Sequence, residues 1–175
     1  MNKNKIIIIG GAGHVGAPLG IALSSKGYDV TLLDINTKFI KMLNNGQMPF
    51  IEDKCESLLK KSLKRKKIFS TNDFDQIRKF LKKKIRKDQS IIIRSSIFPS
   101  TFEKVYEIIK SRCKNLTYCP ERIAQGKSIV ELPKISQIIS GSSSKEIKKI
   151  SIIFRKISKK IIIVSSLEAE LLKLF

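Results

Sequence analysis

A run of four isoleucines at residues 6–9 leads directly into the glycine-rich segment at residues 10–16, Gly-Gly-Ala-Gly-His-Val-Gly. The isoleucine run is typical of a strand buried in a parallel sheet, and apolar residues at helical spacing follow the glycine segment. Gly11, Gly13 and Gly16 form the pattern G-x-G-x-x-G. A strand, this turn and a helix in that order predict a dinucleotide-binding βαβ unit.

Each glycine of the pattern is expected at its position for a physical reason. We expect Gly11 to allow the tight turn, Gly13 to let the backbone approach a pyrophosphate, and Gly16 to let the helix pack closely on the strand. The phosphates would then lie at a helix N-terminus, where unpaired N–H groups and the helix dipole favour an anion. The predicted phosphate-binding loop consists of Gly11, Gly13, His14, Val15 and Gly16.

An acidic residue follows the second apolar run. Asp34 comes directly after residues 28–33, roughly 20 residues beyond the glycines, where the fingerprint requires a ribose-binding acid. Its carboxylate would repel a 2′-phosphate, so NAD is favoured over NADP. The alternative is a glycine-rich turn in a sheet protein that binds nothing.

Strand and helix patterns alternate along the chain, which predicts a doubly wound, mostly parallel Rossmann-like α/β sheet. Residues 1–164 are expected to form this domain, and residues 165–175 to begin a further helix. Ile-rich strand runs occupy residues 6–9, 30–33, 91–93, 138–139 and 161–164, and helical patterns occupy 15–26, 36–45, 52–64, 74–86, 101–112 and 143–157.

The formal net charge is +20, from 35 Lys and Arg against 15 Asp and Glu, with concentrations at residues 60–67 and 79–87. A nucleic-acid or anionic membrane surface is one interpretation of this excess, and solvated helix faces are the other. Lysines recur along the whole chain and no RNA-binding signature is present. We therefore expect no specific nucleic-acid partner.

Three cysteines, Cys55, Cys113 and Cys119, are an odd number without metal-ligand spacing. The N-terminus enters a predicted strand almost at once, which is not typical of a signal peptide. The apolar runs are far shorter than a membrane span. These features predict reduced thiols, no metal, no membrane association and a cytoplasmic location.

Several later segments, in the same order, resemble the nucleotide-sugar dehydrogenases, the group that includes UDP-glucose and UDP-N-acetylmannosamine dehydrogenases. Residues 94–101 are similar to the family's S-T-x-x-P-G-T turn, and residues 119–127 to its P-E-R-x-x-E-G segment. The Pro-Phe-Ile-Glu and Pro-Glu-Arg-Ile versions look more like the N-acetylated-sugar branch. The segments are residues 34–36 (DIN), 43–52 (LNNGQMPFIE), 69–71 (FST), 94–101 (RSSIFPST), 119–127 (CPERIAQGK) and 168–175 (EAELLKLF).

This resemblance implies an NAD-dependent oxidoreductase of polysaccharide precursor synthesis. Such an enzyme oxidises the C6 alcohol of a UDP-sugar to a carboxylate in two steps, through a thiohemiacetal on a cysteine. Ser96 matches the family threonine near the nicotinamide that helps to position water, and Glu121 matches the glutamate of acid–base work in thioester hydrolysis. From the residues alone, Glu121 could equally be a surface loop acid.

Three departures from the family pattern limit the expected activity. The chain ends at the start of the family's central helix, before the sugar-binding domain with its nucleophilic cysteine, and none of the three cysteines lies in a matching context. After residue 73 the family has a strand and a V-P-T-P turn that contact the cofactor, whereas a helical pattern follows here. Ser96 also replaces threonine, and Ser100 replaces glycine.

The missing strand would be the neighbour of the first one. Either residues 91–93 take its place, in which case the role implied for Ser96 fails, or the sheet is split. In both cases its absence predicts that NAD binds weakly or not at all.

We therefore expect the NAD-binding portion of a UDP-sugar 6-dehydrogenase that is not active alone. The expected partners are a second copy of the chain in a homo-oligomer, or a partner chain that supplies the missing domain. A stand-alone NAD-binding or regulatory module without turnover is the alternative, followed by a basic nucleic-acid-binding protein.

Overall fold

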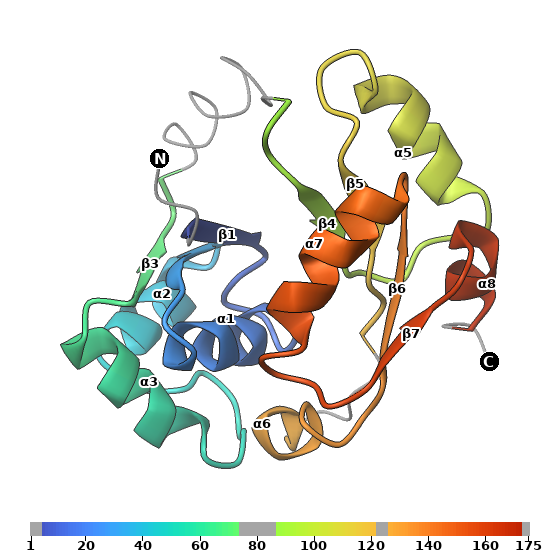
Figure 1. Ribbon diagram of the computed structural model, residues 1–175. Helices are drawn as coiled ribbons and strands as arrows, with labels where there is room; N and C mark the ends of the chain where they lie inside the picture. Colours follow the sequence, from blue (N-terminus) through green and yellow to red (C-terminus); the bar gives the residue numbers. More distant parts are fainter. Residues whose placement is uncertain (1–4, 74–86, 122–125, 173–175) are drawn as a thin grey trace. The chain divides into compact units, whose positions relative to one another are not determined.

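The computed structural model describes residues 5–73, 87–121 and 126–172 (Figure 1). The chain divides into two compact units, and the strands of the described residues form two separate hydrogen-bonded sheets. The first unit comprises Met1–Asp75 and Ile123–Pro133, and the second comprises Gln76–Arg122 and Lys134–Phe175.

The first unit contains a parallel sheet in the order β1-β2-β3. Its register places Ile8 opposite Leu32, and Leu32 opposite Ser70. The elements are β1 (Lys5–Ile9), β2 (Asp29–Leu33), β3 (Ile68–Thr71), α1 (Gly16–Ser25), α2 (Thr37–Asn44), α3 (Cys55–Lys64) and α6 (Ser128–Glu131).

Helix α1 packs against β2 and against α3. The approach to the sheet is so close that a Cβ on Gly20 would lie 2.5 Å from Leu32 Cδ2. Ile21 is fully buried within the same helix. This packing fixes the N-terminus of α1 at the carboxyl end of β1, where the glycine segment joins the two elements.

Strand β1 differs from its prediction, because its isoleucine run is not buried on both faces. Ile7 and Ile9 are 40% and 66% exposed, whereas Ile6 and Ile8 are half-buried. The residues alternate because β1 is the last strand of its sheet and α1 covers one face. A continuous apolar run therefore does not by itself show that both faces are covered.

The second unit contains a mixed sheet in the order β4-β5-β6-β7. The β4–β5 and β6–β7 pairs are parallel, and the β5–β6 pair is antiparallel. The elements are β4 (Ile91–Ile93), β5 (Leu116–Tyr118), β6 (Gln137–Gly141), β7 (Ile161–Ile163), α5 (Thr101–Ile109), α7 (Ser144–Phe154) and α8 (Ser166–Leu171).

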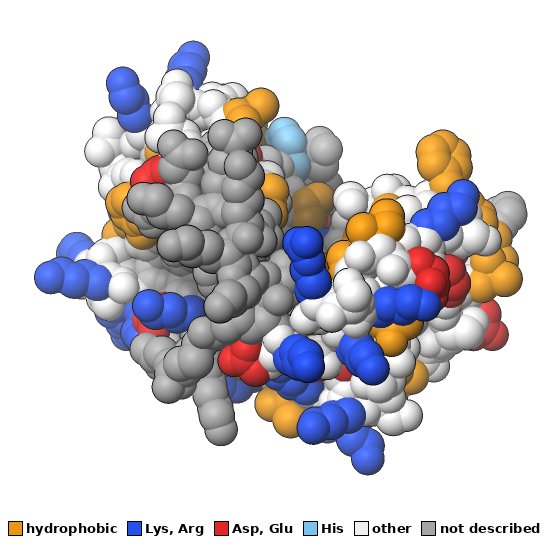
Figure 2. All heavy atoms as spheres, turned by 90° about the horizontal axis from the view of Figure 1, so that it is seen from above, with side chains coloured by type: hydrophobic (Ala, Val, Ile, Leu, Met, Phe, Trp, Pro, Cys, Tyr) orange, Lys and Arg blue, Asp and Glu red, His pale blue; other side chains and the backbone are white. Residues whose placement is uncertain are grey.

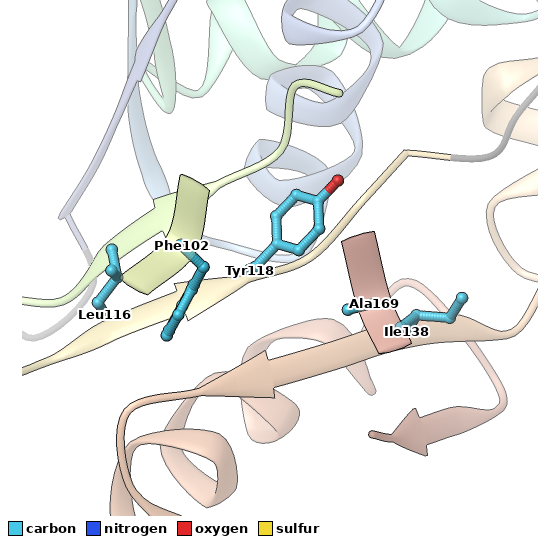
Figure 3. Packing of buried hydrophobic residues seen from close by; sticks show 5 residues of the cluster. All are labelled: Phe102, Leu116, Tyr118, Ile138 and Ala169. Atoms are coloured by element: carbon cyan, nitrogen blue, oxygen red, sulfur yellow. The ribbon is translucent and has the colours of Figure 1, made fainter. Parts of the chain in front are cut away.

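Two helices are fixed to this sheet by one hydrophobic cluster (Figure 3). Its buried members come from α5, β5, β6 and α8, and Figure 3 shows the ring of Tyr118 rising from its strand. The cluster consists of Phe102, Leu116, Tyr118, Ile138 and Ala169. Because α5 and α8 share it, the start of α5 is held against α8 and the sheet.

The mostly parallel α/β fold is confirmed, and the structure decides between the two predicted arrangements. β4 pairs with β5 and, among the described residues, not with β1, so the sheet is split. The helix predicted at residues 74–86 lies outside the described residues. The prediction that a family strand is missing after residue 73 concerns the same segment and stays a prediction. The domain bounds 1–164 and 165–175 stay predictions.

Side chains cap the starts of α2 and α7. Asn36 Oδ1 accepts the Phe39 N–H at 3.1 Å, and Ser143 Oγ accepts the Glu146 N–H at 3.2 Å. At α5, which begins at Thr101, the N-cap Ser100 provides no side-chain hydrogen bond.

Charge is dispersed over the surface drawn in Figure 2, where uncharged and acidic side chains lie between the lysines and arginines. Among the described residues, no helix has the length and apolar character needed to cross a membrane.

Candidate dinucleotide-binding site

The turn between β1 and α1 depends on glycine at Gly10 and Gly11 for different reasons. Gly10 has a φ of +71°, a left-handed conformation that favours glycine. The Gly11 N–H donates to Leu33 O at 2.9 Å, and a Cβ on Gly11 would lie 2.7 Å from Leu32 Cα. The tight turn predicted at Gly11 is therefore made by Gly10, and Gly11 permits the close approach to β2.

Gly16 and Gly13 differ in the room around them. A Cβ on Gly16 would lie 2.3 Å from Gly10 O and 2.8 Å from Gly11 Cα, so the helix start requires glycine because it packs on the turn after β1, whereas the predicted close approach to the strand is made at Gly20. A Cβ on Gly13 would meet its nearest atom, Gly10 O, at 3.4 Å, which is ordinary contact. The packing of the protein therefore does not require glycine at position 13. Glycine is expected at such a position when a bound ligand would occupy the space of a side chain.

Three backbone N–H groups at the start of α1 have no partner among the described residues, namely those of His14, Val15 and Gly16. By contrast, the Gly13 N–H donates to Gly10 O at 3.2 Å and the Ala17 N–H donates to Gly13 O at 3.0 Å. The first turn of α1 contains no acidic residue. Unpaired donors and an uncompensated helix dipole together form a suitable place for a phosphate.

Asp34 links this loop to the start of α2. Its Oδ2 accepts the Ala12 N–H and its Oδ1 accepts the Asn36 N–H, both at 3.0 Å. A carboxylate has about four lone-pair positions, so each oxygen can accept a further hydrogen bond. The side chain is half-buried beside the loop, where ribose hydroxyls could reach it.

The ring of His14 stacks on Phe50, with centroids 3.9 Å apart and planes at 30°. This contact joins the phosphate loop to the segment after α2. The same segment ends in Glu52, which is buried and accepts the Gly126 N–H at 2.9 Å and the Ser128 N–H at 3.1 Å. The sequence analysis gave Phe50 and Glu52 only as part of a motif.

In the second unit, Ser96 and Glu121 follow β4 and β5. Because these strands are parallel neighbours, their carboxyl ends meet at one edge of the sheet, and both residues lie along that edge. Ser96 is exposed in the turn between β4 and α5.

Glu121 forms an ion pair with Arg94, and both side chains are largely buried, at 14% and 10% exposure. The guanidinium also donates to Gln137 Oε1 at 3.0 Å and lies over the Phe154 ring, 5.0 Å from its centroid. The Glu121 carboxylate is therefore held in place by a charge-assisted bond. Arg94 was expected only as the first residue of the 94–101 motif, although a cation directly after an isoleucine run was a signal.

The cysteines described are all free and buried. Burial raises the pKa of Cys119 to about 12. The pKa of Cys55 is also raised to about 12, first by burial and then by Glu52 and Asp53. At neutral pH both are thiols rather than the nucleophilic thiolates that covalent catalysis requires.

The fold, the glycine loop and the acid after β2 together define a Rossmann-like dinucleotide-binding domain. The model of the UDP-glucose/GDP-mannose dehydrogenase family, NAD binding domain, matches residues 4–80 and 75–158. The chain belongs to this family.

Curated and solved relatives agree with this assignment. A UDP-N-acetyl-D-mannosamine dehydrogenase from Methanococcus maripaludis is 26% identical, over 97% of this chain and 46% of its own length. A GDP-mannose 6-dehydrogenase from Pseudomonas syringae is 43% identical over 68 residues, which are 39% of this chain and 16% of that protein. The solved UDP-D-ManNAc dehydrogenase from Pyrococcus horikoshii has a TM-score of 0.86 at 25% identity, covering 97% of this chain and 49% of its own.

The chain thus spans about half the length of the relatives that it matches along its length. The alignment with the Methanococcus maripaludis enzyme occupies 200 positions, more than the 175 residues present here, so that enzyme has aligned segments without a counterpart. The match to the family model consists of two segments, which overlap at residues 75–80. The shortening predicted from the sequence falls in the same part of the chain.

Proposed function

We propose that this chain provides the NAD-binding half of a UDP-sugar 6-dehydrogenase, with an N-acetylated hexosamine as the sugar. The observation that carries the proposal is the loop of residues 10–16. Three N–H groups there lack partners among the described residues, a Cβ on Gly13 would meet its nearest atom only at 3.4 Å, and Asp34 accepts the Ala12 N–H of the loop. The names of the similar Methanococcus and Pyrococcus enzymes support the choice of sugar.

In this proposal the diphosphate of NAD accepts hydrogen bonds from the N–H groups of His14, Val15 and Gly16. Gly11 and Gly13 keep the backbone close to it, and Asp34 accepts hydrogen bonds from the adenosine ribose. A 2′-phosphate beside Asp34 would place two anions together, so NADP is disfavoured. NAD supplies the hydride acceptor when bound.

Ser96 and Glu121 are the two polar groups of this chain that we propose to take part in the oxidation. The Ser96 hydroxyl is exposed at the carboxyl edge of the second sheet and can relay a hydrogen bond to water. Glu121 can accept a proton from water only from the position in which Arg94 holds it, so Arg94 determines its orientation.

An NAD-binding module without turnover is the second candidate function. The buried thiols of Cys55 and Cys119, each with a pKa of about 12, are not suitable nucleophiles, so neither of them would carry covalent catalysis within this chain. The two functions differ in chemistry but not in cofactor binding. A dehydrogenase half completes a reaction when the sugar-binding half is present, whereas a module does not.

Isothermal titration calorimetry with NAD tests cofactor binding, which the two candidate functions share. We expect binding to the wild-type chain, and at least about tenfold weaker binding to Gly13→Ala, because a methyl group there would occupy the space of the diphosphate. No measurable binding to a folded wild-type chain would refute the proposal.

The absorbance of NADH at 340 nm then separates the two functions. The chain is mixed with NAD, UDP-N-acetylmannosamine and the sugar-binding half of a related dehydrogenase. NADH formation supports the dehydrogenase half, and NAD binding without any NADH supports the module.

A further inference from the structure

Glu170 is a buried carboxylate whose partners are both backbone groups of another helix. It lies on α8, is 0% exposed, and accepts the Ser100 N–H at 2.7 Å and the Phe102 N–H at 2.9 Å. These two donors begin α5, whose N-cap Ser100 provides no side-chain hydrogen bond. A carboxylate from a distant part of the chain therefore replaces the missing cap.

Glu170 also bonds to a residue whose backbone conformation is unfavourable. Ser100 has φ 66° and ψ 9°, a left-handed conformation that residues with a Cβ rarely adopt. Its own N–H is one of the two that Glu170 accepts. The carboxylate thus stabilises a backbone conformation that the local sequence disfavours.

A second contact joins the same two helices, because the Ser166 hydroxyl of α8 donates to the Glu103 carboxylate of α5. Ala169, next to Glu170, packs in the cluster that also contains Phe102 (Figure 3). The position of α8 is therefore transmitted to the start of α5 by polar and apolar contacts together.

We propose that Glu170 is a positioning residue: its carboxylate fixes Ser100 in the left-handed conformation and so places the turn that carries Ser96. Residues 95–100 connect β4 to α5, and Glu170 holds the α5 end of that connection. A displacement of α8 would move Ser96. The significance for catalysis rests on the role proposed for Ser96, but the coupling itself does not.

Amide hydrogen exchange measured by NMR tests the coupling, with two variants of the same helix. Glu170→Gln replaces two acceptor oxygens by one, so we expect exchange at Ser100 and Phe102 at least about tenfold faster, with a shifted Ser96 amide resonance. Glu168→Gln is the matched control, because Glu168 is exposed and accepts only the Ser165 N–H and hydroxyl within α8. Equal exchange at Ser100 and Phe102 in both variants would overturn the proposal.

A rescue distinguishes positioning from general stability. Ser100→Gly removes the cost of the left-handed conformation. In the E170Q background it should return the Ser96 resonance toward its wild-type position, while in the wild-type background the resonance should hardly move. Failure of this rescue in a folded double variant would contradict the proposed role. If E170Q does not fold, Glu170→Asp, with its shorter carboxylate, replaces it in both comparisons.

The same samples separate this inference from the proposed function. NAD is added to the wild-type chain and to each variant, and the thermal shift is recorded. A wild-type chain without a shift refutes NAD binding and leaves the exchange result intact. Unchanged exchange in E170Q refutes the role of Glu170 and leaves NAD binding intact.

Discussion

The two units of the chain use their polar groups in opposite ways. In the first unit, the N–H groups of His14, Val15 and Gly16 lack partners among the described residues, and no acidic residue occupies the first turn of α1. In the second unit, Glu170 is buried and the Arg94 side chain is largely buried, and both form hydrogen bonds with other groups of the same unit.

This difference separates a surface prepared for a ligand from a framework that positions side chains. Unpaired donors at a helix N-terminus have a cost that a bound anion removes. A buried ion pair or cap, in contrast, gives orientation without the need for a ligand. The first unit is therefore expected to respond to NAD, and the second to substitutions of its internal partners.

The largest effect is expected for Gly16→Ala in the first unit. Its methyl group would lie 2.3 Å from Gly10 O, and backbone atoms cannot move aside as a flexible side chain can. We expect the free energy of unfolding to fall by about 3 kcal/mol or more, measured by urea denaturation. A change below about 0.5 kcal/mol would show that the loop is not packed as described.

Arg94→Met gives the corresponding test in the second unit. It removes the charge-assisted bond that Arg94 donates to the largely buried Glu121, at a cost of about 3 kcal/mol in the free energy of unfolding. The matched control is Lys110→Met, whose pair with Glu107 is exposed and contributes less than about 1 kcal/mol. Adding Glu121→Gln to R94M should recover part of the loss, and equal effects of R94M and K110M would argue against a held carboxylate.

Gly13→Ala is expected to separate ligand binding from folding. Since its Cβ would meet only Gly10 O, at 3.4 Å, the free energy of unfolding should change by less than about 0.5 kcal/mol. NAD affinity should fall at least about tenfold, or about 1.4 kcal/mol. Wild-type affinity in G13A would mean that the diphosphate does not approach this residue.

The smallest effect concerns the start of α8 at low pH. Hydrogen bonds from the Ser165 N–H and hydroxyl lower the pKa of Glu168 from its ordinary value of 4.5. Because the folded-state pKa is depressed, the capping box contributes fully above pH 4.5 and is lost as pH falls through the lowered pKa. The Ser165 amide resonance, followed from pH 6 to pH 2, should move in that acid range, and a transition at or above the ordinary value would contradict the assignment.

The sequence predicted the first unit better than the second for a physical reason. Strand β1, the glycine turn, α1 and Asp34 are specified by residues close together in the chain, each with its own local signal. Strands β3 and β5 were missed because Ile68–Thr71 and Leu116–Tyr118 are short and contain polar residues. The antiparallel β5–β6 pair has no local signal either.

The partners in the second unit could not be predicted, because they depend on pairs distant in sequence. Arg94 and Glu121 are 27 positions apart, and Glu170 reaches Ser100 across 70 positions. The sequence alone does not show whether a given glutamate is buried or exposed. Even within the first unit, the sequence placed the tight turn at Gly11, whereas the positive φ belongs to Gly10.

Whether the first unit binds NAD can be measured by a thermal melt with millimolar NAD, with NADP as the control. Ligand that binds only the folded state adds about 2.7 kcal/mol when its concentration is 100 times Kd. We expect a higher melting temperature with NAD, no change with NADP, and a smaller rise with NAD in Gly13→Ala because its affinity is lower. A cooperative melt that NAD leaves unchanged, or that NADP shifts equally, would contradict the account.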